Sequence, residues 1–527
     1  GTIFDHGVSW DESMRFRSGD RKLEYYQALF AGEDLPELGN DKYPGLFDLP
    51  LAWFDEQFPE LGTRHEKGHV WSLLFGLVGI FAGWRLAVLL AGERAGFWAL
   101  LLLIATPRYY GHMFFNPKDT PLAAMYLLGL YALIRLLKGL PTLRPQSFVL
   151  FGVAAGLTVA VRIGGLLLLC YLGLFLGLFL VWRWVEPVWR REQPVGRLLP
   201  PTGWWSMAGK AVGLSFASAL IAGVILLAFW PAAHGNPFAH ASGTMESVQS
   251  FGWDGHVLFQ GQHIQATELP RSYLPVWLLI TTPEVILLLL LIGAVFGAKT
   301  LIADRGWLGE ADPVRLLPMV ALVFSFVFPI AYIVITKPVL YDGLRHALFV
   351  VAPMSIAAAI SFEYLLRFLG GNQALAKYAT IAKAAVGGAV VLVLVDFVTL
   401  HPYQYVYFNA SSGGLRGALG QYETDYWGLS HRQAAEWLNA YVALTEGDND
   451  EVHYIYVPYY PLMLTPFVSD RFLVTNNPAK ADFFVSITRL GFHTAANGPT
   501  LYEVVRQGTP LCVVKDLRSE EDRASSY

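Results

Sequence analysis

The sequence predicts a multi-span α-helical membrane protein with a small α/β domain at its C-terminal end. Of its 527 residues, 54% are hydrophobic and only 15% are charged, whereas soluble proteins average about 25% charged residues. Apolar runs of about 18 residues or more recur up to residue 400, and such runs are long enough to cross a bilayer. Beyond residue 400 the runs stop and short strand-like segments begin. The net charge of −4 argues against a nucleic-acid partner.

The first segment, residues 1–68, is polar with interspersed aromatic residues. Residues 10–30 are predicted to form an amphipathic helix that lies along the membrane surface. Ser9 followed three residues later by Glu12 is a capping box, which marks a helix start. We expect 1–68 to form an extracytoplasmic loop. A chain that begins outside must be delivered there, so we also expect a membrane span before Gly1.

Ten apolar segments are predicted to span the membrane, and together they define a transmembrane domain over 69–400. They are 69–92, 96–112, 120–137, 147–161, 163–182, 205–230, 275–297, 316–336, 346–363 and 380–400.

The charges of the connecting loops orient these spans. By the positive-inside rule, the loops rich in Lys and Arg are cytoplasmic, and they contain Lys138, Arg144, Arg183, Arg190, Arg191, Arg197, Lys299, Arg305, Arg367, Lys377 and Lys383. The alternation of spans then places the remaining loops outside, namely 1–68, 108–120, Arg162, 231–274, 337–345 and 401–527.

Residues 401–527 are predicted to form a C-terminal extracytoplasmic α/β domain. A helix is expected over 430–443, with Ser430 as its cap and Gln433 completing a capping box. Short strands are expected at 452–457, 471–474, 482–488 and 510–514.

Ionisable residues at the predicted outer ends of the spans are the candidate site residues. Charges near membrane depth are costly and often functional. Three carboxylates, Asp11, Glu12 and Asp119, share that side with four cations: Arg108, Lys118, Arg162 and Arg345. Lysine and arginine bind phosphate by charge-assisted hydrogen bonds, and a carboxylate can accept the proton of an attacking hydroxyl. The plain alternatives are cations that extend to the headgroups and a solvated helix start at Asp11 and Glu12.

Histidines leave one cofactor question open. His263 in the long loop 231–274 and His65 before the first span are candidate ligands for a divalent metal cation. Their spacing does not match a metal motif such as H-E-x-x-H, which favours ordinary surface histidines. The cofactor is therefore unknown from the sequence.

Several of these residues stand in an order that resembles a known family. An Asp-Glu pair at 11–12 precedes a Tyr43-Pro44 turn, a pair of membrane segments, and a short loop ending in Asp119-Thr120-Pro121. This order resembles the GT-C glycosyltransferases, especially the protein O-mannosyltransferase-like group (glycosyltransferase family 39), which includes the aminoarabinose transferases acting on lipid A. The general resemblance covers 5–240, and 111–121, 230–237, 269–283 and 401–427 resemble a bacterial branch of that group.

The resemblance implies an integral enzyme of the bacterial inner membrane with a periplasmic active site. Such enzymes transfer a sugar from a polyprenyl-phosphate or dolichyl-phosphate carrier to a protein, lipid or glycan hydroxyl. Asp11 matches the family's general base and Asp119 its second acidic position, while Lys118 and Arg162 would lie near the carrier phosphate. This sequence departs from the family pattern in two ways. The family's usual first span is absent from the residues given. The double proline that is common after the family's first loop is Pro44-Gly45 here, and this second difference concerns how the acceptor is bound.

Two other functions remain as alternatives. A transporter or flippase for a lipid-linked substrate would show paired, interrupted helices near mid-membrane, related by a repeat. The sequence shows no repeat, and its charges lie at one face, apart from Asp396. A non-catalytic subunit with the same fold is the other alternative, and the retained Asp11 and Asp119 argue against it.

Overall fold

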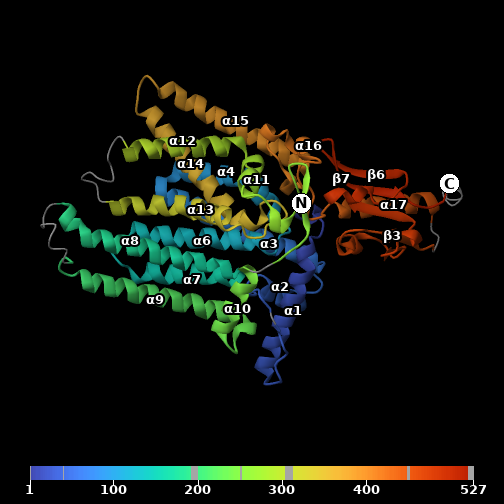
Figure 1. Ribbon diagram of the computed structural model, residues 1–527, viewed down its shortest axis with the longest axis horizontal. Coiled ribbons are helices and arrows are strands. Elements are labelled where there is room, and N and C mark those ends of the chain that lie inside the picture. Colours follow the sequence, from blue (N-terminus) through green and yellow to red (C-terminus); the bar gives the residue numbers. More distant parts are fainter. Residues whose placement is uncertain are drawn as a thin grey trace.

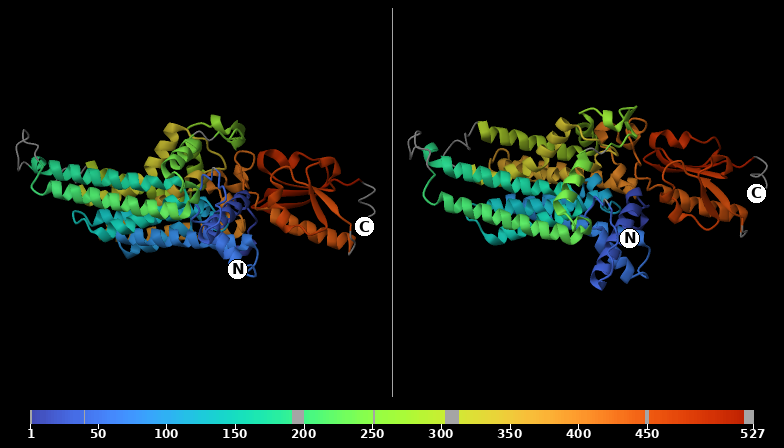
Figure 2. Two further views of the ribbon diagram at one scale, coloured as in Figure 1. Left: turned by 90° about the horizontal axis from the view of Figure 1, so that it is seen from below. Right: turned by 60° about the horizontal axis from the view of Figure 1, so that its bottom comes forward.

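A bundle of long helices carries a smaller sheet-containing domain at one end (Figure 1). The computed structural model describes residues 2–39, 41–190, 200–249, 252–302, 313–447 and 451–519. Arg191, Arg197 and Arg305, which contribute to the charge bias, lie outside these residues. In all three views the sheet domain extends beyond the end of the bundle (Figure 2).

Within the described part of the chain, seven helical segments are long and apolar enough to cross a membrane, which confirms the predicted multi-span class. Helices α6 and α14 lie at the centre of the bundle. The buried share of their most apolar 18-residue stretch is 83% and 78%, whereas in α9 it is 11%. The seven helices are α3 (Arg64–Ala91), α6 (Asp119–Lys138), α8 (Leu167–Trp189), α9 (Trp204–Phe229), α13 (Leu317–Thr336), α14 (Leu348–Gly370) and α15 (Ala376–Leu400).

Three of the ten predicted segments differ from a single long helix. Residues 96–112 divide into α4 (Glu93–Ile104) and the short α5 (Pro107–His112). The break falls at Thr106, which is extended because a residue before proline avoids the helical region. At about 1.5 Å per residue, α4 is shorter than a bilayer core. The segment 147–161 forms α7 (Pro145–Val161), whose 17 residues are also fewer than in the seven long helices.

The segment 275–297 is a bent pair, α11 (Tyr273–Thr281) and α12 (Glu284–Ile302), with an angle of 112° at the break. Pro283 lies in the break and cannot continue a helical hydrogen-bond ladder. Asn409 binds the carbonyls exposed there: its side-chain Nδ2 donates to Leu279 O at 2.7 Å and to Thr282 O at 2.9 Å. A residue from a distant part of the chain therefore completes the turn.

Two helices lie across the end of the bundle, α1 (Trp10–Ala31) and α2 (Asp48–Gln57) (Figure 1). The predicted helix over 10–30 is confirmed, and so is its capping box at Ser9 and Glu12. The solvated helix start is wrong, because the exposed fraction is 4% for Asp11 and 1% for Glu12. Farther along the chain, α10 (Pro237–Gln249) precedes a hairpin of β1 (His256–Phe259) and β2 (Gln262–Gln265).

The C-terminal part contains a five-stranded sheet of order β4-β3-β5-β7-β6. Strand β3 pairs in parallel with β4 and β5, whereas β7 pairs antiparallel with β5 and β6. The strands are β3 (His453–Tyr456), β4 (Phe472–Thr475), β5 (Phe483–Ile487), β6 (Thr500–Arg506) and β7 (Thr509–Asp516). Four of them correspond to predicted strands, and β6 was not predicted.

Helix α17 (His431–Glu446) packs on this sheet, with Trp437 stacked on Tyr502 at 4.8 Å between ring centroids. The predicted capping box at its start is wrong. Ser430 makes no side-chain cap because its hydroxyl hydrogen-bonds Asp425. The amide of Gln433 donates instead to Tyr502 Oη at 2.8 Å.

Candidate active site

The first turn of α1 contains two adjacent carboxylates, Asp11 and Glu12, and each contacts a different set of residues. Glu12 completes the capping box: its Oε1 accepts from Ser9 N at 2.7 Å and from Ser9 Oγ at 2.9 Å. Its Oε2 lies 3.0 Å from His65 Nδ1 and 3.3 Å from His69 Nε2. Burial raises the pKa of Glu12, but His69 and His65 outweigh it and bring the pKa to about 2. Glu12 therefore ties α1 to α3.

Asp11 faces two cations from distant segments. Its Oδ2 lies 3.0 Å from Arg345 Nη1 and 3.3 Å from Lys118 Nζ. Burial, the largest single influence, raises the pKa of Asp11, but Lys118 and Arg345 together lower it below its ordinary value. The carboxylate is thus held ionised in a place almost without solvent contact, where an unpaired charge would be costly.

Asp119 is the first residue of α6 and belongs to a tight polar turn. The side-chain Oδ1 of Asn116 accepts from Lys118 N at 3.0 Å and Asp119 N at 2.8 Å, an Asx turn that fixes the helix start. Asn116 Nδ2 donates to Asp119 Oδ2 at 3.2 Å, and Arg162 Nη1 lies 3.1 Å from Asp119 Oδ1. A carboxylate in this position is also favoured by the helix dipole.

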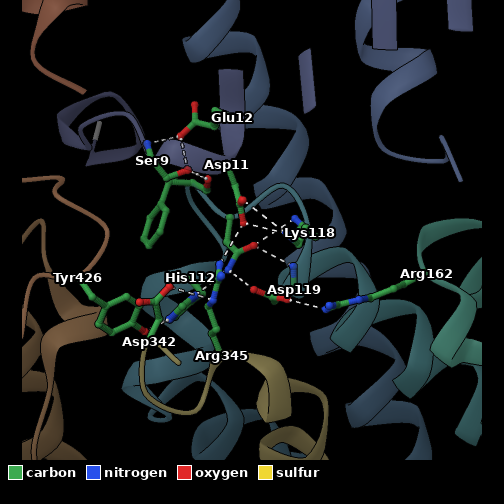
Figure 3. Close-up of polar contacts among 12 residues, drawn as sticks. Ser9, Asp11, Glu12, His112, Lys118, Asp119, Arg162, Asp342, Arg345 and Tyr426 are labelled. Carbon is green, nitrogen blue, oxygen red and sulfur yellow. Dashed lines mark hydrogen bonds and ion pairs between the residues drawn. The ribbon is translucent and has the colours of Figure 1, made fainter. Parts of the chain in front are cut away.

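Most of the predicted residues therefore meet in one cluster (Figure 3). Five belong to it: Asp11, Lys118, Asp119, Arg162 and Arg345. Arg162 is its most exposed member, with 21% of its side chain accessible, against 9% for Lys118 and 2% for Arg345. A charged ligand approaching this cluster would meet Arg162 first.

Arg108 is not brought into direct contact with this cluster. Its guanidinium donates to Tyr407 O at 3.1 Å and lies 5.4 Å from the Trp277 ring centroid. A series of hydrogen bonds connects it indirectly, through Tyr426, His112 and then Asn116, at 3.5, 3.1 and 2.9 Å. Its role in phosphate binding stays a prediction.

The two histidine candidates for a metal belong to different groups. His65 contacts Glu12, whereas the exposed His263 on β2 lines a cavity beside Glu423. Among the described residues, one set of acidic and histidine side chains is close enough to hold a metal: Glu446, Glu451 and His453. Arg518 and Arg471 already pair with Glu446, at 2.8 and 2.9 Å. A divalent metal at His65 or His263 therefore stays a prediction.

A buried series of ion pairs, which sequence analysis did not predict, extends the cluster into the C-terminal part. Arg345 Nε lies 3.2 Å from Asp342 Oδ2, and Asp342 Oδ1 lies 2.7 Å from Arg489 Nη2. Arg489 Nε is in turn 3.3 Å from Glu423 Oε1. We call Asp11, Arg345, Asp342, Arg489 and Glu423 the charge series. Asp342 stands in the same polar loop as Arg345, but no local pattern marks Arg489 or Glu423.

These features define an integral membrane protein with a polar site at one end of its helix bundle. The family model described as dolichyl-phosphate-mannose-protein mannosyltransferase matches residues 50–194. The match includes Lys118, Asp119 and Arg162 but ends short of Arg345 and begins after Asp11. Over these residues, the match agrees with the resemblance to the GT-C glycosyltransferases stated from the sequence.

Solved structures with a similar arrangement have low sequence identity. ArnT from Cupriavidus metallidurans bound to undecaprenyl phosphate is 13% identical, over 97% of this chain and 95% of that chain, with a TM-score of 0.45. The oligosaccharyltransferase AglB from Archaeoglobus fulgidus, in complex with an inhibitory peptide and a dolichol-phosphate, is 12% identical. That comparison covers 91% of this chain and 66% of that chain, with a TM-score of 0.44. A comparison with curated proteins found no significant match.

Proposed function

We propose that this chain transfers a sugar from a polyprenyl-phosphate carrier to a hydroxyl group of a protein, lipid or glycan. The observation that carries the proposal is the ionised, buried Asp11 held between Lys118 and Arg345, beside a second carboxylate at Asp119. The charge bias of the loops supports a site on the periplasmic side of a bacterial inner membrane.

In this proposal the carrier phosphate binds to Arg162 and Lys118. Both lie at the cluster, and Arg162 is partly accessible. Each already contacts a carboxylate, so a phosphate competes with Asp119 and Asp11 for these cations. Phosphate accepts the same charge-assisted hydrogen bonds from lysine and arginine as a carboxylate does, so it can take the place of either carboxylate. The description of the matching family, which names dolichyl-phosphate-mannose, supports a lipid-phosphate donor.

Asp11 acts as the general base. It removes the proton from the acceptor hydroxyl, whose oxygen attacks the anomeric carbon while the bond from that carbon to the phosphate oxygen breaks. The carrier leaves as a phosphate anion stabilised by Lys118 and Arg162, and the single displacement inverts the anomeric centre. A general base works best with a pKa near the working pH. When phosphate binds Lys118, one of the two cations that lower the pKa of Asp11 is withdrawn, and the carboxylate becomes a better base.

One structural feature bears on the transporter alternative. Interrupted helices are typical of transporters, and the α11–α12 pair is broken. However, the carbonyls at this break bind Asn409 rather than facing an open path. Among the helices described, one pair is broken in this way, whereas a transporter repeat requires two. The transferase is therefore the better-supported function.

The test uses the purified chain in lipid vesicles with undecaprenyl-phosphate sugars as donors and a panel of hydroxyl acceptors. We expect release of undecaprenyl phosphate together with glycosylated acceptor, and loss of both in Asp11→Asn. Movement of the lipid-linked sugar across the bilayer without cleavage, at an equal rate in Asp11→Asn, would instead identify a flippase. A chain that binds the donor and neither cleaves nor moves it would be a non-catalytic subunit.

A further inference from the structure

The cavity that His263 lines lies beside the distal end of the charge series. Its volume is about 350 Å³, at the lower end of the range of about 300–1,000 Å³ for ligand pockets. Three segments form it: the β1–β2 hairpin, residues 419–424, and the loop 488–493 after β5. The cavity therefore lies where the loop between α9 and α11 meets the C-terminal part of the chain.

Backbone contacts hold the walls of this cavity together. Phe259 forms an isolated antiparallel bridge with Tyr422, and Gly261 N donates to Gln421 O at 3.0 Å. Gly261 has a φ of +76°, a left-handed conformation that suits glycine. On the opposite wall, Thr488 N donates to Leu511 O at 3.0 Å, which ties the loop to β7. The cavity is thus built from fixed backbone.

The polar groups of the cavity retain unused hydrogen-bonding capacity. Glu423 is 1% exposed, and within the described residues neither of its carboxylate oxygens meets a donor with full hydrogen-bond geometry. Its neighbours are Arg489 Nε at 3.3 Å and the backbone amide of Leu258, whereas a carboxylate can accept about four hydrogen bonds. The ring atom Nδ1 of His493 is likewise buried without a partner in the described chain.

We propose that this cavity binds a neutral saccharide unit of the acceptor, an inference that rests on the transferase function proposed above. Hydroxyl groups both donate and accept, so they suit a carboxylate, an arginine and the hydroxyls of Thr424 and Thr488 together. Burial raises the pKa of Glu423 to about 7, against the opposing effect of Arg489. Near neutral pH the group can therefore either accept a hydrogen bond or donate one.

Charge favours a neutral ligand over an ion. Arg489 is already paired with Asp342 and Glu423, at 2.7 and 3.3 Å, so it does not offer a free positive charge to an anion. The same pairing reduces the attraction of Glu423 for a cation. The ring of Tyr422 adds an aromatic wall, and pockets that combine such walls with a few convergent polar groups are typical of small-molecule sites.

The cavity is connected to the candidate catalytic carboxylate by contact. Arg489 lines the cavity and pairs with Asp342, which pairs with Arg345, which pairs with Asp11. A saccharide bound here would lie on the C-terminal side of the cluster, away from Arg162.

The test is direct binding of sugars, measured without a donor. The full chain in nanodiscs is titrated with methyl glycosides and free disaccharides, and binding is detected by saturation-transfer NMR. We expect at least one saccharide to bind, and Glu423→Gln and Thr488→Val each to weaken it roughly tenfold, the effect of losing one good hydrogen bond. Both substitutions nearly preserve side-chain shape, and thermal unfolding checks the fold. Glu436→Gln, on the exposed face of α17, is the matched control and should not change binding.

Two outcomes would overturn the inference: none of the saccharides binds, or binding is the same in wild type, Glu423→Gln and Thr488→Val. These outcomes are distinct from failure of the proposed function. If sugar transfer occurs but both cavity variants keep the wild-type acceptor KM, the transferase stands and the cavity proposal fails. If saccharides bind as expected but undecaprenyl-phosphate sugars are not cleaved, the cavity stands as a saccharide site and the transferase proposal fails.

Discussion

The two faces of the first turn of α1 carry adjacent carboxylates with contrasting surroundings. Glu12 is held by its own helix cap and by two histidines of α3, all contributed by residues 9–69. Asp11 is held by Lys118 and Arg345, which come from the loop before α6 and the segment before α14. Both are buried, so burial does not separate them. The difference lies in whether their partners can be exchanged for a ligand.

The Ser9 cap of Glu12 cannot be replaced by a ligand without unwinding the start of the helix. Asp11 has partners whose charged ends are also suited to phosphate. This contrast assigns chemistry to Asp11 and support of the fold to Glu12, and the following experiments test it.

The largest effect is expected for Asp11→Asn. Asparagine keeps the size of the side chain but cannot accept a proton as a carboxylate does, and general-base catalysis contributes about 10²–10⁴-fold. We expect kcat to fall within that range while donor binding is retained, as measured by initial rates and by donor titration. Glu12→Gln is the paired variant and should retain most of the turnover. Equal losses in both variants would remove the distinction between the two carboxylates.

Next in size is the effect of Arg489→Met on stability. This change leaves Asp342 and Glu423 buried without their shared cation, and breaking a buried pair typically costs about 3–5 kcal/mol. We expect a large decrease in Tm by thermal unfolding in detergent. Adding Glu423→Gln should recover part of the loss, since one uncompensated carboxylate is then removed. A wild-type Tm for Arg489→Met would show that the charge series does not stabilise the fold.

A smaller effect, on the donor side, is expected for Arg162→Ala. Loss of a charge-assisted contact to the carrier phosphate should raise the donor KM or lower kcat/KM by more than about tenfold. Arg94→Ala is the matched control, because Arg94 pairs with Glu363 and its side chain is 65% exposed. If Arg162→Ala, Lys118→Ala and Arg345→Ala all keep the wild-type donor dependence, the cluster does not bind the carrier.

The smallest effect concerns pH and Glu12. Folding lowers the pKa of Glu12 from 4.5 to about 2, so its ionised form stabilises the fold above pH 4.5, and this contribution is lost as the pH falls toward 2. The Tm difference between wild type and Glu12→Gln should therefore be greatest near neutral pH and become smaller as the pH falls from 4.5 to about 2. Glu66→Gln removes the similar but more exposed capping box of α3, and it should lower the Tm by less than Glu12→Gln does at every pH. A difference that widens on acidification would contradict this account.

The sequence predicted the features that depend on local pattern. The long apolar helices, the start of α1 at Ser9 and four of five strands follow from periodicity and capping residues. It also placed Asp11, Lys118, Asp119, Arg162 and Arg345 on one side of the membrane, where the structure brings them into contact. The charge bias of the loops was enough to group them.

The features that were missed depend on distant partners. The α11–α12 break has a local signal in Pro283, but the bent geometry is completed by Asn409 from beyond α15. Ser430 bonds Asp425 rather than capping α17, which the S-x-x-Q pattern could not reveal. The apolar and polar residues of strand β6 alternate only weakly, so it was not predicted. The turn that follows it, at Gln507 and Gly508, has positive φ at both residues, as a two-residue hairpin turn requires. Arg489 reaches Asp342 only through tertiary folding.

The charge series also has a consequence for how this protein is made. A membrane protein is inserted as it is synthesised, and the spans up to α14 can enter the bilayer while the ribosome is still translating the C-terminal part. At that stage Asp342 has one cation, Arg345, and lacks Arg489. Arg345 is then shared between Asp342 and Asp11 without the second arginine that balances them. An incomplete chain therefore cannot complete the charge series, and a nascent product truncated before residue 489 should leave Asp342 and Glu423 without the arginine that they share.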